Sequence, residues 1–190
     1  MNEKQKQFAF HSSFIVPTSS LFFMSEQIRA VVITSSDACA RGERVDESGA
    51  VLAELLRGAG AEIVAAEVLA DDLELLKERL RAYAERADVN LIVTTGGTGF
   101  SPRDNTPEAT RAVIERDAPG LAEAMRAETL RQTPTAMISR GVCGIRAGTL
   151  IINLPVAPKA VRECFAVIRP VLGHAVTLLA GGSHEEAKKA

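Results

Sequence analysis

Apolar and polar positions repeat along this chain in two periods. Short runs of apolar, often β-branched residues over 28–34, 61–69 and 89–94 have the length and composition of buried strands. The segments after these runs space their apolar residues three or four apart, as amphipathic helices do. Alternating strands and helices favour right-handed crossovers, so we predict an α/β fold. Its form is a three-layer sandwich in which helices cover both faces of a mostly parallel sheet.

The predicted helices begin at capping residues and end near glycine or proline. Asp46 or Ser48 caps the first helix, which closes near Gly58, and Asp71 with Asp72 opens the second. Further helices are expected over 107–116, 119–130, 160–168 and 171–179, the last two separated by Pro170. Two short strands are expected near 136–139 and 150–154, with turns at Gly141, Gly144 and Gly148.

The two ends of the chain depart from this pattern. Residues 1–24 hold five of the seven phenylalanines, mixed with Ser, Thr and Pro and without a regular period. We expect this segment to be a disordered extension or the result of a misassigned start, with Met24 as the true first residue. A signal peptide is the weaker alternative, because polar residues and Pro17 interrupt its apolar part. Residues 25–182 form the expected single domain and 183–190 a polar tail.

Composition narrows the functional classes. A net charge of -2 at pH 7 gives no electrostatic reason to expect nucleic acid or an anionic membrane as the partner. No apolar run approaches the roughly 20 residues that span a bilayer. The three cysteines are far apart and lack Cys-x-x-Cys spacing, which fits reduced thiols in a cytoplasmic protein rather than disulfides or a zinc site. We expect Cys143 and Cys164 to be small core residues.

Polar residues gather at the carboxyl ends of the predicted strands. Because these ends meet at one edge of a parallel sheet, residues distant in sequence converge there, and ligands of such sheets bind outside this edge. The residues concerned are Ser36, Asp37, Asp71, the loop 96–104, Ser139, Asn153 and Pro155. This convergence predicts a ligand site.

The most unusual stretch is 93–110, which reads V-T-T-G-G-T-G-F-S-P-R-D-N-T-P-E-A-T. Three glycines within four residues follow a strand, and Thr106 is placed to cap the next helix with Pro107 at its first position. Glycines let backbone N–H groups approach a phosphate, and the helix N-terminus adds partial positive charge. The stretch therefore predicts an anion site, although it is not a Walker A loop. The structural alternative is an ordinary glycine-rich turn.

Two carboxylates close to this loop suggest a metal-bridged phosphate. Loop N–H groups can hold phosphate oxygens while Asp71 and Asp104 bind Mg²⁺, a cation that often takes one or two carboxylates together with phosphate oxygens. Such a metal offsets the charge that builds up during phosphoryl or nucleotidyl transfer. Each residue also has a structural alternative: Asp71 as a helix cap, Asp104 as the partner of Arg103, and Ser36–Asp37 as a turn.

The seventeen residues Thr94–Thr110 resemble the signature of the molybdopterin adenylyltransferases, the MogA/MoaB family that includes the G domain of gephyrin. The resemblance extends over nearly all of residues 28–182. It includes S-S-D at 35–37, D-E-S-G at 46–49, P-G-L at 119–121, S-R at 139–140, G-I-R at 144–146 and L-I-I-N-L-P at 150–155.

The resemblance implies a cytoplasmic homotrimer that binds molybdopterin and Mg-ATP. It would transfer AMP to the terminal phosphate of molybdopterin and release pyrophosphate, ahead of molybdate insertion with a partner protein. The two family carboxylates tied to activity match Asp71 and Asp104, the expected Mg²⁺ ligands. The phosphate-facing loop matches Gly96, Gly97, Thr98 and Gly99, and the pterin pocket matches Ser36, Asp37, Ser139, Asn153 and Pro155.

One departure from the family pattern leaves other functions open. The family usually has Leu-Pro-Gly-x-Pro where this chain has Val156 in place of glycine. If this position takes a positive φ or approaches the ligand, Val156 costs about 1–2 kcal/mol or crowds the pocket. It thus slightly favours a catalytically weak relative that holds a pterin or a partner protein, whereas Asp71 and Asp104 favour the enzyme. A phosphate-sugar or nucleotide enzyme on a flavodoxin-like sheet is the third alternative.

Overall fold

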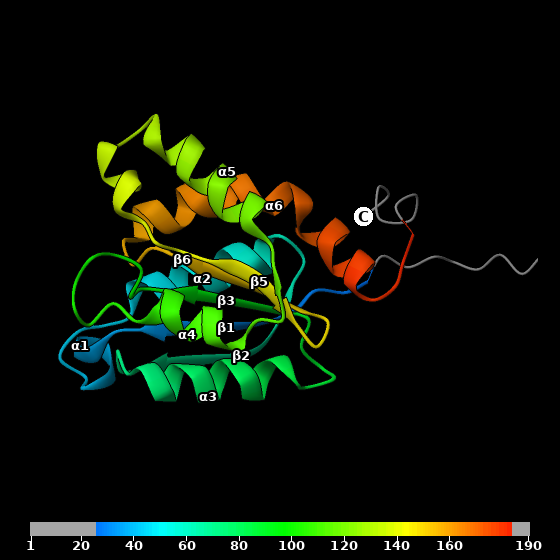
Figure 1. Cartoon of the computed structure of the whole chain (residues 1–190), viewed down its shortest axis with the longest axis horizontal. Helices are drawn as coiled ribbons and strands as arrows, with labels where there is room; N and C mark the ends of the chain where they lie inside the picture. The colour runs from blue at the N-terminus through cyan, green and yellow to red at the C-terminus, as the bar shows by residue number, and fades with distance from the viewer. Residues whose placement is uncertain (1–25, 184–190) are drawn as a thin grey trace, which may run out of the picture.

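The computed structural model describes residues 26–183 of the chain, and residues 1–25 and 184–190 are not described (Figure 1). The predictions for residues 1–24 and for nearly all of the 183–190 tail therefore lie outside the described residues. Within residues 26–183, no helix is both long enough and apolar enough to cross a membrane.

Strands and helices alternate through most of the described chain, as predicted. The elements are β1 Arg29–Ser35, α1 Asp37–Ala40, α2 Glu47–Gly58, β2 Glu62–Leu69, α3 Leu73–Ala84, β3 Leu91–Thr95, α4 Thr106–Val113, β4 Arg116–Asp117, α5 Pro119–Leu130, η1 Pro134–Ile138, β5 Cys143–Arg146, β6 Thr149–Leu154 and α6 Pro158–Leu179. The first three strands agree with the predicted runs to within two residues at each end.

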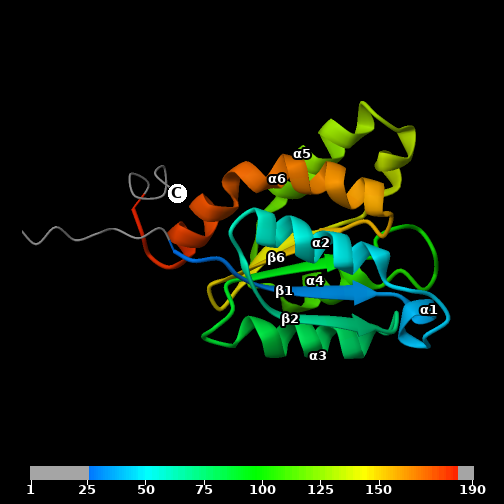
Figure 2. The same ribbon diagram turned by 180° about the vertical axis from the view of Figure 1, so that it is seen from behind.

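The strands form one sheet in the order β2-β1-β3-β6-β5-β4. The strands β2, β1, β3 and β6 pair in parallel, whereas β5 and β4 add an antiparallel edge. Figure 1 shows α4 in front of the sheet, and Figure 2, from behind, shows α2 in front. The predicted mostly parallel sheet with helices on both faces is confirmed.

Successive residues of a central strand belong to two different cores. In β1, Ala30 and Val32 pack with α2, α5 and α6, while Val31 and Ile33 pack with α3 and α4. The same division holds in β3 and β6. Because both faces of these strands are buried, their sequences are continuously apolar, as in other covered parallel sheets. Polar residues stand at the carboxyl ends of these strands, among them Ser35, Thr95 and Asn153.

The segment between α5 and β6 differs from the prediction of a strand at 136–139. Residues Pro134–Ile138 form the short 3₁₀ helix η1, and the strand lies later, at β5. The sequence carries a helix start here, because the Thr133 side chain caps η1 and Pro134 follows it directly. Ser139 therefore follows a helical turn and not a strand.

Of two glycines that were expected in turns, one lies in a turn and the other lies in a strand. Gly148 lies in the turn between β5 and β6 with a φ of 86°. Gly144 instead lies inside β5, so its assignment to a turn was wrong. A Cβ at Gly144 would meet the side chain of Ile114 at 2.6–2.9 Å, which explains a glycine within a strand.

A single helix, α6, runs over Pro158–Leu179 where two helices were predicted. Pro170 lies inside it, although proline removes one backbone hydrogen bond and usually ends a helix. Ile168 and Leu172, on either side of Pro170, are both 1% exposed in the same core. Their packing keeps both halves of α6 on the sheet, and this tertiary contact outweighs the local cost of the proline.

Candidate functional site

The loop after β3 passes close to the end of β1, and this approach requires glycine. Gly96 and Gly97 have φ values of 90° and 61°, which side chains disfavour. A Cβ on Gly96 would collide with the carbonyl oxygen of Ser35, and one on Gly97 would collide with the side chain of Thr106. The glycines therefore set the path by which the loop leaves the sheet.

Four successive N–H groups of this loop have no acceptor among the described residues. They belong to Gly97, Thr98, Gly99 and Phe100, whereas the N–H of Gly96 donates to the carbonyl of Leu154 at 3.2 Å and that of Ser101 donates to Asp104. Successive unbonded N–H groups after a left-handed turn, next to the start of a helix, suit an anion. The geometry thus agrees with an anion site rather than a glycine-rich turn alone.

The start of α4 lies one residue earlier than predicted. Asn105, not Thr106, is the N-cap, and Thr106 and Pro107 occupy the first helical positions. The Asn105 side chain does not cap the helix but donates to the backbone carbonyl of Asp71 at 3.3 Å. The hydroxyl of Thr106 is buried and makes no hydrogen bond with a described residue.

Asp71 lies just after β2 and faces the end of β1. Its Oδ1 accepts a hydrogen bond from the Ser35 hydroxyl at 2.6 Å, and its Oδ2 accepts one from the N–H of Asp37 at 3.0 Å. Asp37 reciprocates, because its Oδ1 accepts from the N–H of Asp71 at 3.0 Å. The cap of α3 is Asp72, so the alternative role of Asp71 as a helix cap is wrong.

Asp37 is the partner of Arg103. The guanidinium donates from Nε and Nη2 to both carboxylate oxygens of Asp37 at 2.8–3.0 Å. The N–H of Asp71 and then the Arg103 guanidinium hold the pKa of Asp37 below its ordinary value. Asp37 is therefore ionised at neutral pH, and the alternative pairing of Arg103 with Asp104 is wrong.

Ser36 begins the short helix α1. Its Oγ accepts from the N–H of Cys39 at 3.4 Å and from Nη2 of Arg44 at 3.3 Å. Ser36–Asp37 is thus a helix start whose two side chains serve different partners, and not a simple turn.

Asp104 lies against the glycine loop. Its Oδ2 accepts from the N–H of Ser101 at 2.8 Å, and a Cβ on Gly99 would come within 2.9 Å of this oxygen. Its Oδ1 receives no hydrogen bond from a described residue. Asp104 therefore keeps one carboxylate oxygen available beside the predicted anion site.

A cavity of about 330 Å³ lies between the glycine loop, α5, η1 and the start of α6. This volume is at the lower end of small-molecule sites. The predicted site residues that line the cavity are Gly97, Thr98, Gly99, Asp104, Ser139, Asn153 and Pro155. Ala122, Met125 and Ile138 add apolar wall. Apolar walls beside a row of N–H groups suit a ring system that carries an anionic group.

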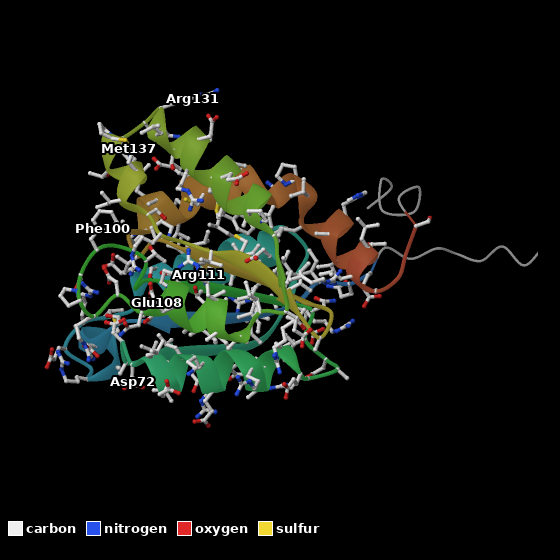
Figure 3. The ribbon with its side chains drawn as sticks, in the orientation of Figure 1. Asp72, Phe100, Glu108, Arg111, Arg131 and Met137 are labelled. Carbon is white, nitrogen blue, oxygen red and sulfur yellow. The ribbon has the colours of Figure 1, made fainter. Side chains whose placement is uncertain are left out.

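The remaining predicted residues do not line this cavity. Gly96 begins the glycine loop directly after β3. Ser36, Asp37 and Asp71 lie on the β1–β2 side of the same edge of the sheet, and Asn105 joins the two halves through its contact with Asp71. Figure 3 shows Asp72, Phe100 and Met137 at one end of the molecule, although they come from three distant segments. The predicted convergence therefore holds, in two adjoining halves.

Asn153 has a structural role inside the cavity wall. It is 2% exposed, and its Nδ2 donates to the hydroxyls of Thr94 at 3.1 Å and Thr110 at 2.9 Å. Its Oδ1 accepts from the N–H of Val142 at 3.1 Å. The amide is thus used within the protein, and it joins β3, α4 and β6 in the wall of the cavity.

Sequence reasoning missed two arginines at the site. Arg126 lines the cavity and donates to the carbonyl of Gly141 at 3.0 Å. Its only sequence signal is a spacing of four from Ala122, which puts both on one face of α5. Arg140 binds the glycine loop itself, and only its place in the S-R motif pointed to it.

Val156 does not have the strained backbone that its replacement of glycine suggested. Among the described residues other than glycine, only Ala147 has a positive φ. Val156 is 45% exposed and lines the large cavity as well as a second cavity of about 200 Å³ next to Asp46 and Ser48. It therefore forms part of the wall between the two cavities, where its side chain takes up space.

Cys143 and Cys164 are core residues, as predicted. Burial raises the pKa of Cys143 to about 12 and that of Cys164 to about 11. Both thiols are therefore protonated at neutral pH, and neither is an activated nucleophile.

The carboxylates fit a metal that is shared with a substrate. In the described part of the chain, no three His, Cys, Asp or Glu side chains are grouped so that they could hold a metal ion. Mg²⁺ often takes only one or two carboxylates and completes its shell with phosphate oxygens and water. Asp104 offers an oxygen without a hydrogen bond, whereas each oxygen of Asp71 accepts one hydrogen bond and keeps a second lone pair for a cation. This donor set suits Mg²⁺ on a phosphate and does not suit a protein-only metal centre.

Sequence comparison supports the resemblance over most of the chain. Residues 31–174 match the family described as the probable molybdopterin binding domain. The chain is 43% identical to the Drosophila melanogaster molybdenum cofactor synthesis protein cinnamon over 81% of its length, but it spans only 26% of that longer protein. It is 38% identical to the molybdopterin adenylyltransferase of Helicobacter pylori strain J99, covering 82% of this chain and 90% of that enzyme.

Solved structures give the same relationship. The molybdopterin biosynthesis enzyme MoaB from Thermus thermophilus is 47% identical with a TM-score of 0.77, covering 82% of this chain and 98% of that one. The molybdopterin biosynthesis Mog protein from Mycobacterium ulcerans is 42% identical with a TM-score of 0.76, covering 83% and 99%.

Proposed function

The chain belongs to the family of probable molybdopterin binding domains, which places it in molybdenum cofactor biosynthesis, and we propose that it is a molybdopterin adenylyltransferase. In this reaction an oxygen of the terminal phosphate of molybdopterin attacks the α-phosphorus of ATP. A new phosphoanhydride bond forms, the bond between the α- and β-phosphates breaks, and pyrophosphate leaves.

The observation that carries this proposal is the row of unbonded N–H groups at the edge of an apolar cavity. The N–H groups of Gly97, Thr98 and Gly99 have no acceptor within the described residues, and the same three residues line the cavity. A phosphorylated ring compound matches both features, because the N–H groups can bind phosphate oxygens and the walls can cover the ring.

The chemistry needs no protein nucleophile, and the site offers no activated one. The phosphate of the acceptor supplies the attacking oxygen, while the loop N–H groups orient phosphate oxygens. Arg103 lies in the loop at the same edge of the sheet, and its side chain is 59% exposed. Its guanidinium can therefore leave Asp37 and bind a phosphate instead. Mg²⁺ held by Asp71 and Asp104 would neutralise charge on the phosphates during the transfer.

The proposal also includes the biological setting that the family resemblance implies. The protein acts in the cytoplasm as a homotrimer and hands its product to a partner that inserts molybdate. Sedimentation equilibrium of the full chain tests the assembly, and a mass of one subunit at micromolar concentration contradicts the trimer.

Substitution of the two acidic residues tests the function. We expect Asp71→Asn and Asp104→Asn each to lower molybdopterin-dependent pyrophosphate release by about 10²–10³-fold, the usual loss when one electrostatic stabiliser is removed. Asp72→Asn is the matched control, because Asp72 is adjacent and exposed and asparagine also caps helices. Equal rates in all three variants, or pyrophosphate release without molybdopterin, would contradict the proposal.

A binding protein without turnover is the second candidate, and Val156 is the observation that favours it. This side chain stands in the wall between the two cavities, and a ligand that extends from one cavity into the other must pass it. Molybdopterin binding that is retained without any pyrophosphate release, and turnover that appears in Val156→Gly, would favour this candidate.

A further inference from the structure

Arg140 is bonded to the glycine loop at three separate points. Its N–H donates to the carbonyl of Thr98 at 2.9 Å, its Nε to the carbonyl of Gly99 at 2.6 Å, and its Nη2 to the carbonyl of Asp104 at 2.6 Å. The fourth contact is an ion pair between Nη1 and Glu108, in the first turn of α4. One residue from beyond η1 therefore holds both ends of a loop that has no regular structure.

These carbonyl contacts also determine where the neighbouring N–H groups point. In a planar trans peptide unit, the carbonyl of one residue and the N–H of the next point in opposite directions. Because the carbonyls of Thr98, Gly99 and Asp104 face Arg140, the N–H groups of the following residues face away from it. The residues that carry these N–H groups are Gly99, Phe100 and Asn105.

The same three N–H groups have no acceptor within residues 26–183. Gly99 lines the 330 Å³ cavity, and Asn105 precedes α4. An N–H group that is fixed in direction and lacks a partner is a donor ready for an anion. The guanidinium thus fixes the direction of the N–H groups of Phe100 and Asn105, whereas the backbone N–H of Arg140 fixes that of Gly99.

We propose that Arg140 is a positioning residue, whose guanidinium acts through the carbonyls of Gly99 and Asp104 to aim the N–H groups of Phe100 and Asn105 at a bound phosphate. The N–H of Gly99, which the backbone of Arg140 orients, adds a third donor. Arg140 does not need to touch the substrate. The identity of that phosphate rests on the proposed function, whereas the positioning itself requires only an anion. The planar fork of arginine is needed, because a single ammonium group cannot reach two carbonyls and a carboxylate in fixed directions.

Three variants of the full chain test the inference, with inorganic pyrophosphate as the probe. Arg140→Ala removes all the side-chain contacts, and Arg140→Lys keeps the charge without the fork. Arg111→Ala is the matched control, because Arg111 is an exposed cation on the same helix as Glu108, where Figure 3 labels both, and forms no hydrogen bond or ion pair with a described residue of the loop. Isothermal titration gives the pyrophosphate affinity, urea unfolding the stability, and steady-state kinetics kcat and KM.

We expect Arg140→Ala to weaken pyrophosphate binding about 10–100-fold, as for the loss of one or two hydrogen bonds to a charged group. Arg140→Lys should recover a minor part of this loss, and Arg111→Ala should bind as the wild type does. KM for the phosphate substrates should rise in step with the pyrophosphate dissociation constant. If Arg140→Ala does not fold, the comparison of Arg140→Lys with Arg111→Ala makes the same test.

A purely structural role gives a different result. Lower stability with unchanged pyrophosphate affinity in the Arg140 variants overturns the inference, and so does a wild type that binds no pyrophosphate. The proposed function fails separately: affinity that depends on Arg140 in a protein without adenylyl transfer supports the positioning role and removes the transferase. Adenylyl transfer together with a pyrophosphate affinity that does not depend on Arg140 supports the transferase and overturns the positioning role.

Discussion

Gly96→Ala is the substitution that most sharply tests why the loop contains glycine. Gly96 has a φ of 90°, and an added Cβ would lie 3.3 Å from the carbonyl carbon of Ser35 and closer still to its oxygen. The backbone at the end of β1 cannot move aside easily, because Ser35 is paired with β2. Alanine at this position therefore meets both a disfavoured φ and a collision with backbone.

The two costs can be separated with a second glycine. The positive φ costs about 1–2 kcal/mol for an alanine, and overpacking typically adds about 1–3 kcal/mol. We therefore expect Gly96→Ala to lower the free energy of unfolding by about 2–5 kcal/mol. Gly42 has a φ of 73° and nothing within 4 Å of an added Cβ, so Gly42→Ala carries the backbone cost alone, about 1–2 kcal/mol.

Urea unfolding followed by circular dichroism measures both variants. The loss of unfolded-state entropy on replacing glycine is the same in each, so it cancels when the two are compared. The slope m should stay constant, which shows that the midpoint reports stability. If Gly96→Ala proves no less stable than Gly42→Ala, the close approach of the loop to β1 is wrong, and the geometry of the anion site is wrong with it.

Further predictions concern the cavity wall, the thiols and the pH dependence. Val156→Gly should lower the free energy of unfolding by about 0.5–1 kcal/mol in urea unfolding. Val156 has no positive φ that glycine would ease, and glycine loses more backbone freedom on folding; a more stable variant contradicts this. In the native protein at pH 8, a thiol reagent should titrate the half-buried Cys39 well before the two buried cysteines, whose pKa values lie near 12 and 11; equal rates for all three contradict the burial. Because the pKa of Asp37 is lowered, the stability difference between the wild type and Arg103→Ala should be present at neutral pH and lost as the pH falls below the ordinary Asp value; a difference that grows in acid contradicts the pairing.

The sequence predicted the fold well where local pattern and tertiary packing agree. The continuous apolar runs of the parallel strands arise because both faces are covered, and the same runs place Asp71, the glycine loop and Asn153 at one edge of the sheet. Prediction failed where packing outweighs a local signal. Pro170 reads as a helix boundary, but buried neighbours on both sides keep α6 continuous.

The positions of the candidate site residues in the fold could be predicted more readily than their hydrogen-bond partners. Asp37 and Asp104 both lie near Arg103, and the sequence offers Asp104, the adjacent residue, as its partner. The choice of Asp37 depends on how β1 and the loop meet, which the sequence pattern does not specify. Arg140 likewise has only its place in the S-R motif to mark it, and its contacts with the glycine loop depend on how η1 brings it back there.

The transfer of the α-phosphate of ATP to molybdopterin tests the central claim most directly. The purified protein is incubated with molybdopterin, Mg²⁺ and ATP labelled in the α-phosphate, and the products are separated by chromatography and identified by mass. We predict that the label enters adenylylated molybdopterin in equal amount to the pyrophosphate released, and that it does so at least about a hundredfold more slowly in Asp104→Asn. Tight molybdopterin binding without any labelled product would contradict the account and assign the protein to the binding class.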